Sequence, residues 1–207
     1  GEAMRPQRRP PVSVVMPTYE RAQLVGRAIA SVLDQSYDDL ELIVVDDGST
    51  DDTEHVVASF GDERVRYIRH ETNRHASAAR NTGIAHSVAG YLAFLDDDDE
   101  WMPTKLSAQM ELMRDAPPEV GLVYCWMDYY DGGGRVVSEV HPTLRGEVFE
   151  RVLDKQRLAG CPTLLVRRSV VDDVGGFDES LPRGNDGDFI RRVCQRYRVD
   201  VVPQVLV

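Results

Sequence analysis

The sequence predicts an α/β fold in which helices flank a mostly parallel central sheet, and three observations support this prediction. In the first half, short runs rich in β-branched residues alternate with segments whose apolar residues recur at helical spacing, which is typical of parallel strands joined by right-handed crossovers. After Pro117 and Pro118 the alternation stops, so the C-terminal part is expected to be mixed or antiparallel. The length of 207 residues suits a single core of ordinary size.

The elements of the first half follow one another in regular alternation. A strand over 12–16 ends at Pro17, and the helix expected over 22–33 carries Val25, Ile29 and Val32 on one face. The sequence therefore begins with a strand followed by a helix, and this unit repeats. Further strands are expected over 41–45, 65–69 and 91–95, and further helices over 51–60, 76–87 and 103–114.

The second half is expected to contain shorter elements. Two runs, over 120–127 and 135–140, flank three consecutive glycines and predict a hairpin or an antiparallel addition to the sheet. Residues 205–207 resemble a strand that either continues beyond this sequence or closes the sheet edge. The remaining expected elements are short helices over 146–153 and 168–174, a strand over 163–166 and a helix over 189–197.

Composition and charge exclude several classes of function. Lys and Arg number 24 against 35 Asp and Glu, and the resulting net charge of -11 argues against the basic field that nucleic-acid binding requires. No nucleic-acid partner is therefore expected. The three cysteines lack the paired spacing of a zinc site and are expected to be reduced and buried. The sequence leaves the oligomeric state open.

The chain shows no sign of a membrane span or of a secretory signal. No apolar run approaches the ~20 residues that cross a bilayer, and no apolar segment follows the basic residues near the N-terminus. We therefore expect no transmembrane segment and a cytoplasmic location, with peripheral binding at the cytoplasmic face of a membrane as an alternative. Residues 1–11, which include a basic, proline-rich stretch from Arg5 to Pro11, are expected to form a flexible lead-in.

Acidic side chains gather where the predicted strands end. In an open parallel sheet the ligand crevice lies beyond the carboxyl ends of the strands, and the strand over 91–95 runs directly into four consecutive aspartates. Two unit charges about 6 Å apart repel by roughly 1 to 3 kcal/mol, so four adjacent carboxylates repel one another, and a bound cation would offset this repulsion. Oxygen ligands favour Mg²⁺ or Mn²⁺ over zinc, and such ions commonly share their ligands with substrate phosphates. An ordinary solvated acidic loop is the alternative.

Four segments in fixed order carry a resemblance to a known family. They are Val-Val-Met-Pro-Thr-Tyr at 14–19, Val-Asp-Asp-Gly-Ser at 45–49, Ala-Ala-Arg-Asn-Thr-Gly at 78–83 and Phe-Leu-Asp-Asp-Asp-Asp-Glu-Trp at 94–101. Together they resemble the inverting family 2 glycosyltransferases. The resemblance implies one GT-A domain over 12–207 with a Rossmann-like, mostly parallel sheet, in which 12–118 bind the nucleotide sugar and 119–207 bind the acceptor. It also implies a nucleotide-diphosphate-sugar donor, a Mg²⁺ or Mn²⁺ ion, and inversion at the anomeric carbon.

The resemblance assigns donor-binding roles to the residues around the first two strand ends. Tyr19 matches the residue that stacks on the nucleotide base. The neighbouring residues Pro17, Thr18 and Glu20 belong to the same substrate-binding segment. Asp47 matches the carboxylate that accepts a hydrogen bond from the base.

The remaining donor and metal positions follow from the third and fourth segments. Arg80 matches a basic residue near the diphosphate. The residues Asp96, Asp97 and Asp98 resemble the Asp-x-Asp motif of the family, whose last carboxylate, Asp98, binds the metal. Asp96 and Asp97 then face the ribose or the water ligands of the ion. Asp99 has the least defined role of the four.

The resemblance places the general base near the C-terminus. Inversion requires a base that takes the proton of the acceptor hydroxyl, and Asp186 matches the acidic residue that opens a helix at this point. Its other possible role is that of a helix N-cap. Asp188 is the rival base. Many relatives carry glutamate where this chain has Asn185 and glycine where it has His75, so the tuning of the base and the shape of the donor loop are expected to differ.

The reaction expected is the transfer of a sugar from a UDP-sugar to an acceptor hydroxyl, with GDP and dTDP as alternative nucleotides. The acceptor is a saccharide, a lipid-linked molecule or another hydroxyl compound. A sugar nucleotidyltransferase is the first alternative, but no glycine-rich basic loop follows the first strand. A phosphatase with an aspartate nucleophile is disfavoured because that strand ends in Pro17 and Thr18. A catalytically inactive nucleotide-sugar-binding module is the alternative from a different class.

Overall fold

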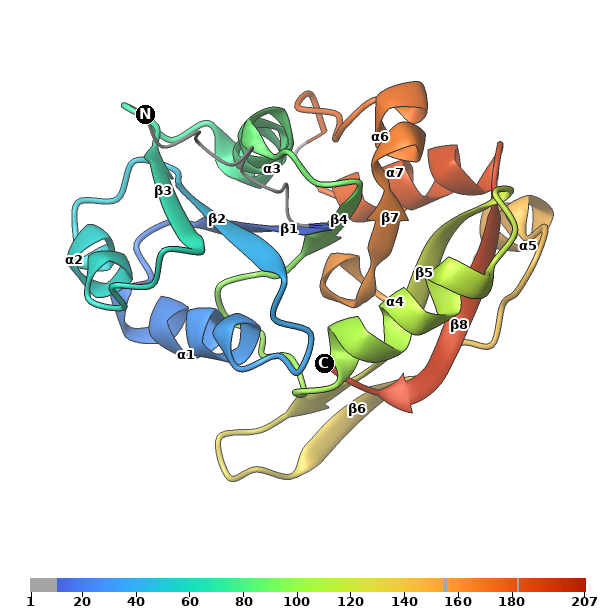
Figure 1. Cartoon of the computed structure of the whole chain (residues 1–207), viewed down its shortest axis with the longest axis horizontal. Helices are drawn as coiled ribbons and strands as arrows, with labels where there is room; N and C mark the ends of the chain where they lie inside the picture. The colour runs from blue at the N-terminus through green and yellow to red at the C-terminus, as the bar shows by residue number, and fades with distance from the viewer. Residues whose placement is uncertain (1–10, 155, 182) are drawn as a thin grey trace, which may run out of the picture.

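The computed structural model describes residues 11–154, 156–181 and 183–207, so residues 1–10 of the expected lead-in lie outside the described residues. Its centre is an eight-stranded sheet in the order β3-β2-β1-β4-β7-β5-β6, with β8 paired to β5 (Figure 1). The strands are β1 (Val12–Thr18), β2 (Leu40–Asp46), β3 (Val65–Arg69), β4 (Tyr91–Phe94), β5 (Val120–Tyr130), β6 (Val136–Val140), β7 (Leu165–Arg167) and β8 (Arg198–Val205).

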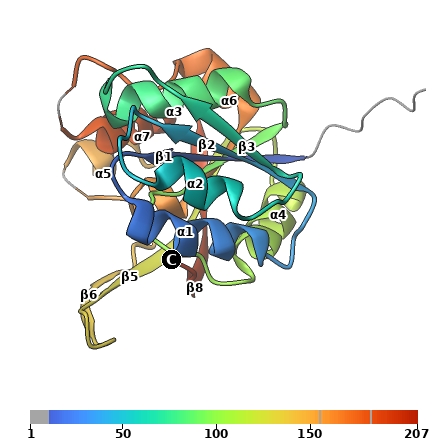
Figure 2. The same cartoon turned by 90° about the vertical axis from the view of Figure 1, so that its left-hand side faces the viewer.

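The expectation of a parallel first half and a mixed second half is confirmed. β1 pairs in parallel with both β2 and β4, and β2 pairs in parallel with β3. β7 is antiparallel to its two neighbours β4 and β5, and β6 forms the predicted hairpin with β5. Figure 2 shows this hairpin projecting from the body of the molecule.

Helices cover both faces of the sheet (Figures 1 and 2). One core lies between the sheet and α1, α2 and α4, and a second lies between the sheet and α6 and α7, with Ile84 of α3 at its border. Because both faces are covered, every residue of β1 and β2 is buried. The helices are α1 (Ala22–Leu33), α2 (Thr53–Ala58), α3 (His75–His86), α4 (Lys105–Asp115), α5 (Phe149–Leu153), α6 (Arg168–Val174) and α7 (Asn185–Cys194), with one 3-10 turn, η1 (Cys161–Thr163).

α3 lies unusually close to β1, and a glycine allows this approach. A Cβ atom on Gly83 would meet Cγ1 of Val15 at 2.3 Å, which is far inside van der Waals contact. The hydrogen at this position lets the helix backbone rest on the strand. The close packing fixes where α3 presents its side chains at the end of the sheet.

The C-terminal elements differ from the sequence-based expectation. The expected strand over 205–207 overlaps the observed strand β8 only at Val205, because β8 begins at Arg198 and ends at Val205. The helix expected over 189–197 begins at Asn185 and ends at Cys194. β8 pairs in parallel with β5, which buries Val199 and Val201. Pro203 is tolerated because β8 has a strand on one side only and its backbone needs fewer donors there.

The topology fixes where a ligand can bind. From β1 the sheet extends in one direction through β2 to β3, and β4 lies on the other side of β1. The order of the strands therefore reverses between β1 and β4, and a crevice is expected beyond their carboxyl ends. Among the helices of the described residues, none combines the length and the apolar character that crossing a membrane requires.

Candidate functional site

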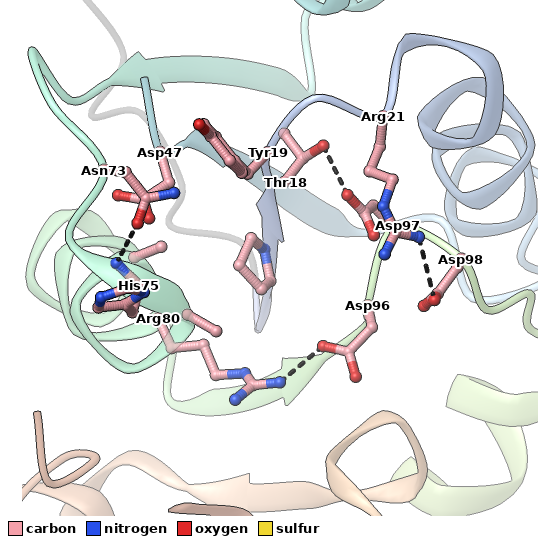
Figure 3. Close-up of a pocket in the computed structure, with 13 residues that line it drawn as sticks. Thr18, Tyr19, Arg21, Asp47, Asn73, His75, Arg80, Asp96, Asp97 and Asp98 are labelled. Atoms are coloured by element: carbon pink, nitrogen blue, oxygen red, sulfur yellow. Dashed lines mark hydrogen bonds and ion pairs between the residues drawn. The ribbon is translucent and has the colours of Figure 1, made fainter. Parts of the chain in front are cut away.

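A cleft of about 400 Å³ lies beyond the carboxyl ends of β1, β2 and β4 (Figure 3). It contains almost all of the residues for which a donor or metal role is expected. It is lined by Pro17, Thr18, Tyr19, Arg21, Asp47, Asn73, His75, Ala76, Ala79, Arg80, Asp96, Asp97 and Asp98. Segments that are far apart in the sequence thus meet at one edge of the sheet, as the strand-end pattern predicts.

One end of the cleft is formed by Asp47 and Tyr19. The side chain of Tyr19 is 44% exposed, whereas that of Asp47 is buried. The Oδ1 atom of Asp47 accepts hydrogen bonds from Nδ1 of His70 at 2.7 Å and from the backbone N–H of Arg74 at 2.9 Å. Asp46 orients the turn, because its Oδ1 accepts the backbone N–H of Ser49 at 2.8 Å.

Glu20 does not line the cleft with its neighbours. Its Oε1 accepts hydrogen bonds from the backbone N–H of Thr50 at 2.6 Å and from the hydroxyl of Thr50 at 3.0 Å. Its own backbone N–H donates to Oγ of Ser49 at 2.8 Å. Glu20 therefore fastens the loop after β1 to the loop after β2. A contact between Glu20 and substrate stays a prediction.

The aspartates that follow β4 have different partners. Asp96 accepts a hydrogen bond from Nη2 of Arg80 at 2.7 Å, and Asp97 accepts one from the hydroxyl of Thr18 at 2.7 Å. Burial raises the pKa of Asp97 against the opposing effect of that hydrogen bond. Thr18 ends β1, so the contact joins the two strands between which the sheet order reverses.

The other two aspartates leave oxygen atoms available for a ligand. Asp98 is half-exposed, and its ion pair with Arg21, at 3.3 Å, is a weak surface contact. The backbone N–H of Asp99 donates to the carbonyl of Asp96 at 3.2 Å, but its carboxylate has no hydrogen-bond or ion-pair partner in the part of the chain that the structure describes. Its pKa is raised to about 7, first by burial and then by the neighbouring carboxylates, with Asp96 the largest among them. A donor set made of carboxylate oxygens, one of them without a partner, fits a hard divalent cation.

Arg80 connects this acidic loop to Asp186. The Arg80 side chain is only 6% exposed, and it donates from Nη1 to Oδ1 of Asp186 at 3.1 Å as well as to Asp96. Its Nε atom is buried and has no hydrogen-bond partner among the described residues. The other oxygen of Asp186, Oδ2, accepts the backbone N–H of Cys161 at 3.2 Å. Asp186 does not itself line the cleft, but both of its oxygens are held, one of them by Arg80, which does.

The local structure distinguishes Asp186 from its rival. Asp186 lies in the first turn of α7, and the N-cap position is occupied by Gly184, so Asp186 is not the N-cap. Asp188 is bound through both oxygens by arginines of its own helix, Arg191 at 2.7 Å and Arg192 at 2.8 Å. Both oxygens of Asp188 are therefore engaged within its own helix, whereas Asp186 contacts Arg80, a residue that lines the cleft, and this favours Asp186.

The two positions expected to differ from many family members, 185 and 75, each have a defined structural role. Nδ2 of Asn185 donates to Oγ of Ser77 at 2.8 Å, which ties the start of α7 to α3. His75 has a φ of 70°, a left-handed conformation that glycine adopts without steric cost. The backbone geometry explains why glycine suits that position.

Sequence reasoning did not single out three residues that shape the cleft. His70 contacts Asp47, Arg21 pairs with Asp98, and the backbone of Cys161 contacts Asp186. The signal for His70 was its place directly after a predicted strand, the same signal that identified the aspartates. The sequence pattern gave no comparable signal for Arg21 or Cys161.

A different group of potential metal ligands lies on the β5–β6 hairpin. The ligand atoms of Asp128, Glu139 and His141 lie within 4.8 Å of one another, and Nε2 of His141 is 2.7 Å from Oδ1 of Asp128. These residues do not line the cleft. Tyr129 follows Asp128 on β5, and its pKa is raised first by burial and then by the carboxylate of Asp99.

Comparison with known protein families identifies a match over most of the chain. Residues 13–175 match the family model described as Glycosyl transferase family 2. An uncharacterised glycosyltransferase of Rickettsia prowazekii is 33% identical over 184 residues, which cover 86% of this chain and 57% of that protein. The Escherichia coli UDP-Glc:alpha-D-GlcNAc-diphosphoundecaprenol beta-1,3-glucosyltransferase WfgD is 39% identical over 102 residues, 49% of this chain and 40% of WfgD. The chain thus spans less than two thirds of either relative.

Solved structures establish the fold. The S. aureus TarS fragment 1–349 in complex with UDP aligns with a TM-score of 0.78 at 20% identity, over 94% of this chain and 59% of that one. The mannosyltransferase PcManGT from Pyrobaculum calidifontis, in complex with GDP-Man and Mn²⁺, aligns with a TM-score of 0.74 at 22% identity, over 98% of this chain and 57% of that one. The described chain is therefore a single α/β domain that matches GT-A glycosyltransferase structures.

Proposed function

The chain belongs to glycosyl transferase family 2, and we propose on that premise that it transfers a sugar from a UDP-sugar to an acceptor hydroxyl with inversion at the anomeric carbon. It is a glycosyltransferase by family, which sets aside the nucleotidyltransferase and phosphatase alternatives. The observation that carries the proposal is the placement of Arg80 between Asp96 and Asp186. Through this arginine the expected base contacts a residue that lines the same cleft as the acidic loop.

The donor is proposed to lie along the cleft with its base between Tyr19 and Asp47. Tyr19 offers an exposed aromatic face, and Asp47 offers a carboxylate oxygen to a ring N–H. Two neighbouring structures support a nucleotide-sugar donor: TarS was solved with UDP-GlcNAc and PcManGT with GDP-Man. UDP is our choice of nucleotide, and GDP is the alternative that the second structure keeps open. The unpartnered Nε of Arg80 and its charge suit a diphosphate nearby.

Asp98 is proposed to hold a Mg²⁺ or Mn²⁺ ion, with Asp96 and Asp97 facing the ribose or the water ligands. The fit rests on the oxygen-only donor set, the half-exposed Asp98 carboxylate and the unpaired Asp99. The Mn²⁺ in the PcManGT complex agrees with this choice of ions. A bound divalent cation would stabilise negative charge on the departing diphosphate without a proton transfer.

Asp186 is proposed to act as the general base. Its carboxylate takes the proton of the acceptor hydroxyl while the oxygen of that hydroxyl forms a bond to the anomeric carbon. The bond between the anomeric carbon and the diphosphate oxygen breaks on the opposite face, and the diphosphate leaves with the electron pair. Arg80 and the backbone N–H of Cys161 hold the carboxylate in its orientation before the acceptor arrives.

The acceptor is proposed to be a hydroxyl of a saccharide or of a lipid-linked saccharide, bound by residues 119–207, whereas residues 12–118 bind the donor. The name of the relative WfgD, which specifies a diphosphoundecaprenol-linked GlcNAc acceptor, supports a lipid-linked molecule as one of the candidates. We place the reaction in the cytoplasm, with attachment at the cytoplasmic face of a membrane for a lipid-linked acceptor.

Binding of UDP with and without Mn²⁺ tests the donor site. Asp98→Asn is expected to abolish the part of the UDP affinity that depends on the metal, because it removes the exposed anionic ligand. Glu100→Gln is the matched control, since Glu100 is an exposed acid that pairs with Arg27 just beyond the acidic loop. Calorimetric titrations should show Mn²⁺-dependent tightening for the wild type and Glu100→Gln, but not for Asp98→Asn. Metal dependence that survives in Asp98→Asn would contradict the assignment. UDP binding without donor hydrolysis or transfer would favour an inactive module.

A further inference from the structure

His70 is a buried residue for which the proposed mechanism has no use. It follows β3 directly, it is 8% exposed, and its backbone N–H donates to the carbonyl of Asp46 at 2.8 Å. Its Nδ1 lies 2.7 Å from Oδ1 of Asp47 and its Nε2 lies 2.8 Å from the hydroxyl oxygen of Thr82. The imidazole ring is therefore fixed through both nitrogens, between the end of β2 and helix α3.

These contacts determine which oxygen Asp47 can offer to a ligand. Oδ1 already accepts two hydrogen bonds, from His70 and from the backbone N–H of Arg74. A carboxylate oxygen has two lone pairs, so Oδ1 has no further capacity. Asp47 lines the cleft beside Asn73 (Figure 3), and Oδ2 has no protein partner among the described residues. Oδ2 is consequently the oxygen that remains for a nucleobase.

His70 also fixes the direction in which this carboxylate points. A carboxylate oxygen is an acceptor, so Nδ1 of His70 donates to Oδ1 of Asp47, while Nε2 contacts the hydroxyl of Thr82 on α3. Without His70, Oδ1 would keep a single donor, the backbone N–H of Arg74, and the Asp47 side chain would be free to rotate. A rotated Asp47 would no longer hold Oδ2 toward the cleft.

We propose that His70 is a positioning residue that sets the nucleobase specificity of the donor site through Asp47. Uracil and guanine present a ring N–H, at N3 and N1 respectively, and both match the acceptor Oδ2. Cytosine presents an unprotonated N3 at the same place, and an ionised carboxylate repels its lone pair. The ligand class selected is therefore a nucleoside diphosphate whose base carries a ring N–H. This inference rests on the proposed donor site.

The affinities for UDP and CDP, measured by calorimetry in the presence of Mn²⁺, test this role. The wild type is expected to prefer UDP by more than about tenfold, because a hydrogen bond to a charged group is lost with CDP. His70→Leu should reduce the UDP-to-CDP preference by about tenfold. His70→Asn should keep it within about threefold, because the amide nitrogen of asparagine can replace Nδ1 as the donor to Asp47.

Two further variants separate positioning from a general structural role. Thr82→Val removes the partner of Nε2 of His70 and leaves the contact with Asp47 in place. The preference for UDP over CDP should therefore fall by about threefold, while the number of nucleotides bound per chain stays the same. In an Asp47→Asn background, His70→Leu should leave the UDP-to-CDP ratio where Asp47→Asn alone puts it, because the two residues act in series. Thermal unfolding of each variant identifies any that does not fold. If His70→Leu does not fold, the UDP-to-CDP ratios of Thr82→Val and His70→Asn test the role of His70.

The outcomes separate this inference from the proposed function. A wild-type chain that binds neither nucleotide overturns the proposed donor site and this inference with it. A wild type that prefers UDP, with a ratio that neither His70→Leu nor Thr82→Val changes, overturns the role of His70 alone. A ratio that falls equally in His70→Asn and His70→Leu also overturns it, because the donor to Asp47 would then be irrelevant.

Discussion

Arg80 is the residue through which the two sides of the cleft are joined. It comes from α3, while its partners Asp96 and Asp186 lie 16 and 106 residues further along the chain. Its planar guanidinium spans two carboxylates at once, which a lysine ammonium cannot do with the same geometry. The residue is also almost fully buried, so its charge depends on these partners.

Arg80→Leu is therefore expected to destabilise the fold by roughly 2 to 4 kcal/mol, because two carboxylates lose their cationic partner in a partly closed site. Urea unfolding at neutral pH measures this change. The exposed pair of Arg21 and Asp98 provides the control, and Arg21→Leu is expected to cost less than about 1 kcal/mol. Equal effects of the two substitutions would show that Arg80 does not hold the cleft together.

The sequence predicted the acidic residues of the cleft better than their partners. Asp47 and the aspartates after β4 follow buried strands directly, and the parallel topology brings such positions together. Whether each one faces a ligand or a neighbouring side chain depends on contacts between distant segments. Glu20 illustrates this, because it belongs to the same strand end as Tyr19 yet its carboxylate binds Thr50.

At the scale of elements, α4 carries a fully buried lysine that has no carboxylate partner among the residues that the structure describes. Lys105 is 0% exposed, its Nζ donates to Oε1 of Gln109 at 2.7 Å, and it lies 4.0 Å above the ring of Trp101. Trp101 in turn donates to the carbonyl of Pro162 in η1 at 2.9 Å. Burial lowers the pKa of Lys105 to about 8. The helix therefore contains a group that titrates within the folded protein near neutral pH.

The stability of the protein is expected to rise between about pH 8 and pH 10.5 because of Lys105. Within this window the unfolded chain, with the ordinary pKa of a lysine, binds more protons than the folded chain, so the free energy of unfolding increases with pH. The contribution is on the order of 3 kcal/mol over the whole window. Urea unfolding of the wild type and Lys105→Met at several pH values measures the difference. Parallel pH profiles for the two proteins would contradict the assignment.

The first-half elements could be predicted because local pattern and tertiary environment agree there. α1 has the bounds that its apolar spacing predicts, and β3 does as well. β8 was not found at its full length because Arg198, Asp200 and Pro203 interrupt its apolar pattern. Its strand conformation comes from pairing with β5, a strand that is distant in the sequence, so a local pattern does not predict it.

At the scale of the whole molecule, the class of fold follows from the sequence but the strand order does not. The antiparallel β7 lies between β4 and β5, and no local pattern reveals that position. Yet this insertion places η1, and with it the backbone N–H of Cys161, next to Asp186. The neighbourhood of the expected base is thus a property of the assembled sheet rather than of any one motif.

At this scale we propose that one cleft binds a nucleotide sugar and that the base acts beside it. The most direct measurement is the turnover of the best UDP-sugar by the wild type, Asp186→Asn and Asp188→Asn, with the donor affinity of each protein. Asp186→Asn is expected to lower turnover by about 10² to 10⁴ and to leave donor affinity within about twofold. Asp188→Asn, whose carboxylate is already bound by two arginines, should stay near the wild type. Wild-type turnover by Asp186→Asn, or a loss confined to Asp188→Asn, would contradict the account.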